Sequence, residues 1–77
     1  MKTALLGAGH IGQTIARLLH ETGDYDVTVI DRNPAYLAPL AARGIATAEV
    51  GMDDEAAMMA LLRGNDAVVN ALPYHLA

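Results

Sequence analysis

Three glycines that follow an apolar segment constrain the fold of this chain more than any other feature. Gly7, Gly9 and Gly12 lie between a strand-like run and a helix-like run, and Asp31 follows Gly12 by 19 residues. This order of strand, glycine loop, helix, strand and acid is typical of dinucleotide binding. The first glycine permits the tight turn, the second leaves room for a pyrophosphate, and the third lets the helix pack closely. We therefore predict a dinucleotide at these glycines, with Asp31 on the adenosine ribose; the alternative is a glycine turn that binds nothing.

Strand-like and helix-like segments alternate along the whole chain. Hydrophobic periodicity, β-branched runs and helix-capping residues predict strands at 2–6, 26–31, 45–50 and 66–72, and helices at 10–21, 34–43 and 53–63. Such alternation produces a parallel sheet with right-handed crossovers. The predicted fold class is α/β: a Rossmann-like half with four parallel strands in the order 3-2-1-4, ending after the fourth strand. The first two helices are expected on one face and the third on the other.

Apolar spacing also predicts which helix residues are buried. The expected core positions are Ile11, Ile15, Leu18 and Leu19 on the first helix, Leu37, Leu40 and Ala41 on the second, and Met52, Met58 and Met59 around the third. Asp53 and Asp54 come just before the third helix, where capping explains adjacent acids better than acid–base chemistry does.

Composition excludes several classes of function. Five Lys and Arg against nine Asp and Glu leave a net charge of −4, which argues against nucleic acid or an anionic membrane as partner. The chain has no cysteine, and its three histidines are scattered, so we expect no disulfide, thiol nucleophile or metal site. We find no signal-peptide pattern and no apolar stretch of about 18 residues, and therefore expect a cytoplasmic protein.

The residues around Asp31 bear on the choice of cofactor. A carboxylate at that position suits a free ribose 2′-hydroxyl and repels a 2′-phosphate, so it favours NAD over NADP. Arg32 leaves NADP open, because it could bind a 2′-phosphate, stack on adenine or remain solvated. His10 and Ile11, between the second and third glycines, are further candidates for contact with the cofactor, although an exposed helix start also explains His10.

Three segments carry a resemblance to a known family. G-A-G-H-I-G-Q-T-I-A-R-L-L, V-T-V-I-D-R-N and D-A-V-V-N-A-L-P-Y-H-L resemble the N-terminal part of saccharopine dehydrogenase-like proteins. The resemblance implies that Asn70, Ala71, Leu72 and Pro73 lie beside the nicotinamide half of the cofactor. It also implies hydride transfer at a C–N bond of an amino acid or imine, in proteins that are often NADP-linked and several hundred residues long.

In that family a second α/β domain supplies the substrate site. Residues 1–77 are then a dinucleotide-binding domain, a fragment of a larger dehydrogenase. We expect no catalytic residue within it and no turnover by this chain alone.

A regulatory nucleotide sensor is the alternative function. The nucleotide-binding domains of potassium-transport regulators share the glycine loop and the acid that ends the second strand. They typically carry G-D-A after the third strand, where this chain has V-G-M-D-D, and the N-A-L-P-Y-H segment favours the dehydrogenase.

The fourth predicted strand has the sequence of a strand that needs a partner. Its A-V-V-N-A-L run is apolar on successive positions, as in strands buried on both faces, and contains no Lys or Pro to protect an edge. We therefore expect either a homodimer through this strand or the bare sheet face, or a larger protein that covers it.

Overall fold

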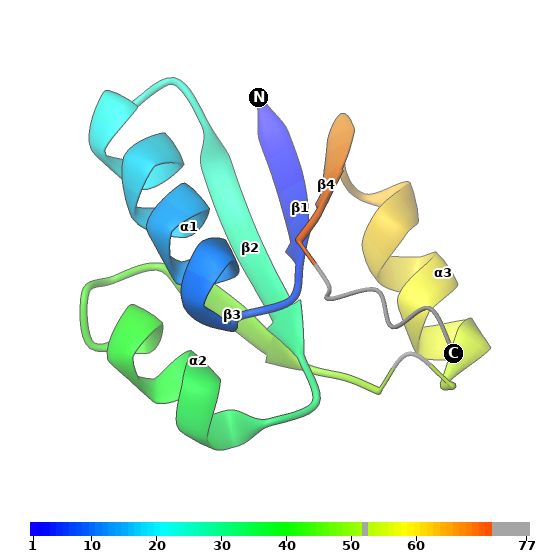
Figure 1. Ribbon diagram of the computed structural model, residues 1–77. Helices are drawn as coiled ribbons and strands as arrows, with labels where there is room; N and C mark the ends of the chain where they lie inside the picture. Colours follow the sequence, from blue (N-terminus) through cyan, green and yellow to red (C-terminus); the bar gives the residue numbers. More distant parts are fainter. Residues whose placement is uncertain (52, 72–77) are drawn as a thin grey trace.

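The computed structural model describes residues 1–51 and 53–71. This part of the chain contains the strands β1 (Lys2–Leu6), β2 (Asp26–Asp31), β3 (Ala46–Glu49) and β4 (Ala67–Asn70) and the helices α1 (His10–Thr22), α2 (Pro34–Ala41) and α3 (Glu55–Arg63) (Figure 1). The strands are parallel and lie in the order β3-β2-β1-β4. The predicted α/β class and strand order are confirmed.

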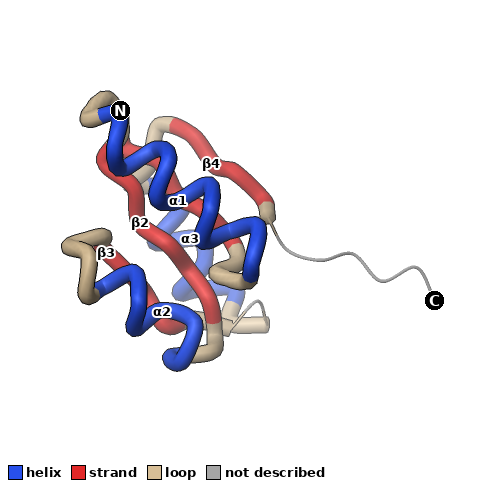
Figure 2. The backbone as a smooth tube through the Cα atoms, turned by 60° about the vertical axis from the view of Figure 1, so that its left-hand side comes forward, coloured by secondary structure: helices blue, strands red, loops and turns tan. Residues whose placement is uncertain are grey.

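Helices cover both faces of the sheet. Figure 2 shows α1 and α2 in front of the strands and α3 behind them. In β1, Leu5 belongs to the core cluster on the side of α1 and α2, whereas Ala4 and Leu6 belong to the cluster that includes Met58 of α3. Alternate side chains of a strand point to opposite faces, so β1 is buried on both sides. None of the helices in the described residues has the length and apolarity of a membrane span.

All four strands end at the same edge of the sheet. Leu6 at the end of β1 is in register with Ile30 and with Asn70, and Asp31 at the end of β2 is in register with Glu49. In open parallel sheets, ligands bind at this carboxyl edge, next to the point where the chain changes direction across the sheet. Here that point lies between β1 and β4.

The predicted buried face of α1 is partly wrong. Ile11 and Leu18 are 69% and 59% exposed. The helix instead packs through Gly12, Ile15, Ala16 and Leu19, of which Gly12 and Ala16 are fully buried. The close approach of α1 to the β1 end requires its smallest residues against the sheet, and this turns Ile11 and Leu18 outward.

In each of the other two helices, one residue that was predicted to be buried is exposed, and the predicted cap of α3 is confirmed. Ala41 of α2 is exposed rather than buried. In α3, Met58 is buried but Met59 is exposed, and Met52 lies outside the described residues. The Asp54 side chain accepts a hydrogen bond from the N–H of Ala57 (3.1 Å), which confirms that it caps α3.

Two strands are shorter than predicted. The N–H of Ile45 still donates to the carbonyl of Leu40 at the end of α2, so β3 begins one residue later. Asp66 precedes β4. Its side-chain carboxylate, rather than a backbone carbonyl, accepts the N–H of Lys2 in β1. Of the predicted end of β4, Leu72 lies outside the described residues.

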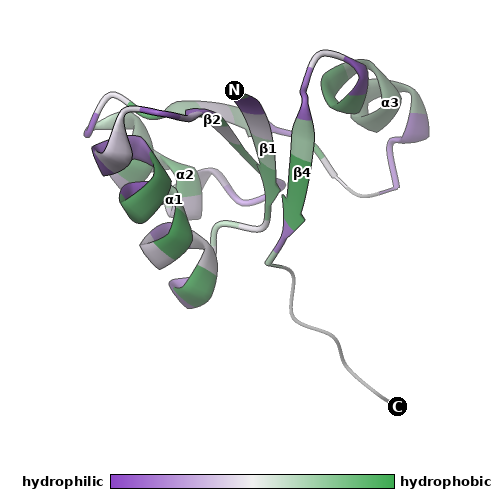
Figure 3. Ribbon diagram, turned by 90° about the horizontal axis from the view of Figure 1, so that it is seen from above, coloured by the Kyte–Doolittle hydropathy of each residue, from purple (hydrophilic) through white to green (hydrophobic). Residues whose placement is uncertain are grey.

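β4 has the burial of an edge strand. Among the described strands it pairs with β1 alone (Figure 3). Val69 packs against the core on the side of α1, but Val68, on the opposite face, is 48% exposed. The sequence of β4 predicts burial on both faces, but in the described residues one face remains partly exposed. The homodimer stays a prediction.

Candidate functional site

The glycine loop connects β1 to α1 at the carboxyl edge of the sheet. Gly7 has a φ of +98°, a left-handed conformation that side chains other than glycine rarely adopt. Its N–H donates to the carbonyl of Ile30 (2.8 Å), which extends the contact between the β1 end and β2. The first glycine therefore makes the tight turn that the sequence predicts.

Gly12 is required by the packing of α1. A Cβ atom at this position would overlap the carbonyl oxygen of Gly7 and lie 2.9 Å from its carbonyl carbon. A real Cβ does not come this close to backbone, so the helix would have to move away from the loop. The third glycine thus lets the first turn of α1 lie directly on the end of β1.

Gly9 has a different role, because the fold itself makes no demand for glycine there. Its backbone is extended (φ −69°, ψ −166°), and an added Cβ would meet no atom of the described residues within 4 Å. Gly9 is also the N-cap of α1, and as a glycine it has no side chain that could cap the helix. The first N–H groups of α1 and the positive end of its dipole therefore face open space, which fits an anion such as a pyrophosphate.

Two candidate residues sit in the first turn of α1. His10 and Ile11 follow Gly9 directly, and both side chains are exposed. Their contact with a cofactor stays a prediction.

Asp31 ends β2 and lies against the glycine loop. Its carboxylate accepts hydrogen bonds from the N–H of Ala8 (2.8 Å) and from the N–H of Asn33 (2.9 Å). Arg32, the next residue, is exposed at the same edge. The structure thus places the acid against the loop and the arginine directly after it in the chain.

The end of β4 approaches the loop from the other side. The N–H of Ala71 donates to the carbonyl of Leu6 (2.8 Å), and the Ala71 Cβ lies 3.8 Å from the position of an added Cβ on Gly12. Asn70 is exposed at the carboxyl edge. Leu72 and Pro73, the other two candidates from this segment, lie outside the described residues.

Sequence reasoning missed two residues that shape the loop. Ala8 is completely buried and connects the loop to Asp31 through its N–H. The side-chain amide of Gln13 donates to the carbonyl of Ala8 (3.1 Å). The position of Gln13, directly after the third glycine, is a signal that could have identified it.

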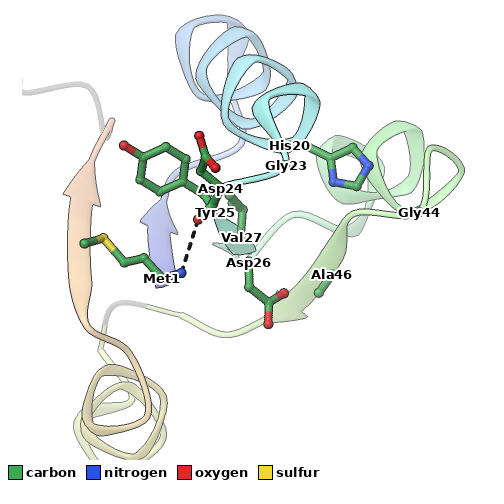
Figure 4. A pocket seen from close by; sticks show the side chains of 9 residues that line it. All are labelled: Met1, His20, Gly23, Asp24, Tyr25, Asp26, Val27, Gly44 and Ala46. Atoms are coloured by element: carbon green, nitrogen blue, oxygen red, sulfur yellow. Dashed lines mark hydrogen bonds between the residues drawn. The ribbon is translucent and has the colours of Figure 1, made fainter.

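A hollow of about 390 Å³ lies at the opposite, amino edge of the sheet (Figure 4). His20 at the end of α1, Asp24 and Asp26 are among the residues that line it. It is remote from the glycine loop, since the two edges are separated by the length of the strands. The described residues contain no group of three or more His, Cys, Asp or Glu side chains that could hold a metal ion.

Comparison with known proteins places the chain in a family. The family model described as the saccharopine dehydrogenase NADP binding domain matches residues 3–77. The chain belongs to this family. The apo, histidine-tagged saccharopine dehydrogenase (L-Glu forming) from Saccharomyces cerevisiae superposes on 95% of this chain with a TM-score of 0.83 and 30% sequence identity, and the match covers 17% of that enzyme.

A weaker similarity points to a second class of protein. Over 37 residues, 48% of this chain, the sequence is 49% identical to the Trk system potassium uptake protein TrkA of Mycobacterium tuberculosis. The match covers 16% of that protein. The chain thus spans about one sixth of the length of each of these relatives.

The family description bears on the expected cofactor. It supports a nicotinamide dinucleotide and favours NADP over the NAD that Asp31 indicated. Both oxygens of Asp31 accept backbone N–H groups, those of Ala8 and Asn33.

Proposed function

We propose that this chain binds NADP or NADPH at the carboxyl edge of its sheet. The observation that carries the proposal is the open space at Gly9 in front of an uncapped helix. Among the described residues a Cβ there would meet no atom within 4 Å, and the first-turn N–H groups of α1 point toward a position that suits two phosphates. Gly7 and Gly12 give the loop the conformation that exposes this backbone.

The adenosine and nicotinamide halves of the cofactor would lie on opposite sides of the loop. We assign the adenosine ribose to Asp31 and its 2′-phosphate to Arg32, because Asp31 ends β2 against the loop and the exposed Arg32 follows it directly. The nicotinamide half would extend toward the end of β4, where Asn70 and Ala71 lie. Leu72 and Pro73 belong to the same assignment through their positions in the sequence.

The larger protein would be an oxidoreductase acting on a C–N bond of an amino acid or imine. Support comes from family membership and from the structural likeness to a saccharopine dehydrogenase. When bound, the cofactor supplies hydride transfer, and this chain would hold and orient it. Residues 1–77 then form the nucleotide-binding domain, and a separate domain supplies the substrate site and the proton-transfer groups.

A regulatory nucleotide sensor is the second candidate, supported by the 37-residue similarity to TrkA. The family match spans residues 3–77, about twice that length, and favours the dehydrogenase. The reading frame around this sequence separates the two. Several hundred further residues that form a substrate domain support the enzyme, and a neighbouring potassium transporter gene supports the sensor.

Calorimetric titration with NADP, NADPH, NAD and NADH side by side tests the proposal. We expect tighter binding of NADP than of NAD, and loss of binding in Gly9→Val, whose side chain would occupy the pyrophosphate space. Arg32→Ala should weaken NADP binding by about 10- to 150-fold and leave NAD binding nearly unchanged, since a charged hydrogen bond contributes about 1.5–3 kcal/mol. Arg43→Ala is the control: it removes the same charge from an exposed residue after α2, away from the carboxyl edge.

Two results would contradict parts of this assignment. Tighter binding of NAD than of NADP by the wild type would refute the assignment of Arg32 to the 2′-phosphate. Equal binding by Gly9→Val and the wild type would mean that the glycine loop is only a turn.

A further inference from the structure

The carboxylate of Asp31 joins two loops at the carboxyl edge of the sheet. One oxygen accepts the N–H of Ala8 in the glycine loop (2.8 Å), and the other accepts the N–H of Asn33 (2.9 Å). Asn33 is the N-cap of α2, and its own side chain accepts the N–H of Ala35 (3.0 Å). A single side chain therefore holds the β1–α1 loop and the start of α2 in fixed positions relative to β2.

The glycine loop depends on this contact. Ala8 is completely buried, so its N–H needs a hydrogen-bond partner inside the protein. That partner is Asp31, 23 residues further along the chain. The carbonyl of Ala8 is held by Gln13 (3.1 Å), and the N–H of Gly7 by Ile30 (2.8 Å). The loop is thus fixed by hydrogen bonds on both sides of Ala8 before any ligand arrives.

We infer that Asp31 is a positioning residue that fixes the glycine loop in the shape that receives the pyrophosphate, by accepting the Ala8 N–H. This inference rests on the proposed dinucleotide function and deepens it. The ribose contact and the loop contact can coexist, because each carboxylate oxygen has two lone pairs and uses one on the backbone. Asp31 should therefore affect the binding of phosphates that carry no ribose at all.

Inorganic pyrophosphate is the probe that isolates this role. Asp31→Asn has nearly the same shape but places an NH₂ group against one of the two backbone donors. We expect the affinities for pyrophosphate and for NADP to fall by similar factors, about tenfold, the loss of one charge-assisted hydrogen bond. Removal of a negative charge alone would strengthen the binding of an anion, so a fall for pyrophosphate cannot arise from charge. In the ligand-free variant, hydrogen exchange at residues 7–12 should accelerate.

Asp66→Asn is the matched control. The carboxylate of Asp66 also accepts a backbone N–H, that of Lys2 (2.9 Å), but at the amino edge of the sheet. The variant makes the same chemical change, but the amide oxygen of Asn can still accept the single N–H of Lys2, so it should leave pyrophosphate affinity unchanged. An equal fall in Asp66→Asn would attribute the effect to general loosening of the fold and overturn the inference.

The remaining outcomes separate this inference from the proposed function. Weaker NADP binding with unchanged or tighter pyrophosphate binding in Asp31→Asn would leave Asp31 as a ribose ligand only, and would overturn the positioning role. A wild type that binds neither ligand would refute the proposed function, while hydrogen exchange would still test the loop contact. If Asp31→Asn does not fold, hydrogen exchange of the wild type tests the inference instead. An Ala8 amide that exchanges as fast as the Gly9 amide would overturn it.

Discussion

Gly9 and Gly12 are three residues apart, yet the same Gly→Ala change should alter ligand binding at Gly9 and protein stability at Gly12. In the part of the chain that the structure describes, a Cβ at Gly9 meets no atom within 4 Å, whereas one at Gly12 collides with the carbonyl group of Gly7. Gly9 also has an extended backbone that alanine adopts without strain. We therefore expect Gly9→Ala to affect ligand binding without destabilising the protein, and Gly12→Ala to destabilise the protein itself.

The two magnitudes follow from this geometry. At Gly9, alanine is a poorer N-cap than glycine by about 0.5–1 kcal/mol. It also restricts the unfolded chain, which stabilises the protein by about 0.4–1 kcal/mol. These effects oppose each other and leave a net change within about 0.5 kcal/mol. At Gly12, the forced shift of α1 should cost about 1–3 kcal/mol. A change of 1 kcal/mol moves the Tm of a domain this small by about 4–8 °C, so Gly12→Ala should lower the Tm by roughly 4–24 °C.

Thermal unfolding and titration with NADP, carried out on both variants, measure the two effects separately. Gly9→Ala should keep a Tm within about 4 °C of the wild type. Its added methyl group lies in the space assigned to the pyrophosphate, so it should still bind NADP at least tenfold more weakly, on the order of 1.4 kcal/mol. A Gly9→Ala variant that loses as much stability as Gly12→Ala would refute the reasoning about open space. One that binds NADP as tightly as the wild type would refute the position of the pyrophosphate.

Three further predictions concern stability and assembly. The hydroxyl of Thr3 is buried and has no hydrogen-bond partner among the residues that the structure describes, so Thr3→Val should raise the free energy of unfolding by about 1 kcal/mol; a lower Tm would contradict this. Asp54→Ala removes the cap of α3 and should cost about 1 kcal/mol in chemical denaturation, with NADP affinity unchanged; weaker NADP binding would instead give Asp54 a part in the site. In sedimentation equilibrium at micromolar concentration, the 77-residue chain should be heavier than its 8.1 kDa monomer, and Val68→Lys on the exposed edge strand should reduce association; a wild-type monomer would remove the predicted homodimer.

Local sequence patterns determined most of the architecture. Alternating strand-like and helix-like segments require crossovers of one hand, and with the glycine loop after the first strand they lead to the order 3-2-1-4 that the structure has. The caps of α2 and α3 were also predictable, because Asn33 and Asp54 bond to N–H groups only a few residues away. The spacing of Gly12 and Asp31 predicted that both would lie at one edge of the sheet.

Only the tertiary structure decided how these parts meet. The apolar spacing of α1 cannot set its rotation, which the contact of Gly12 with the glycine loop determines, and Ile11 and Leu18 are exposed as a result. Nor does the sequence reveal that Asp31 bonds to Ala8, because this contact joins residues 23 positions apart and depends on which strands are neighbours. Periodicity specifies which residues share a face, but the partner of that face depends on packing between distant segments. For that reason the sequence could identify the glycine loop and its acid, while the fold showed that the acid also holds the loop.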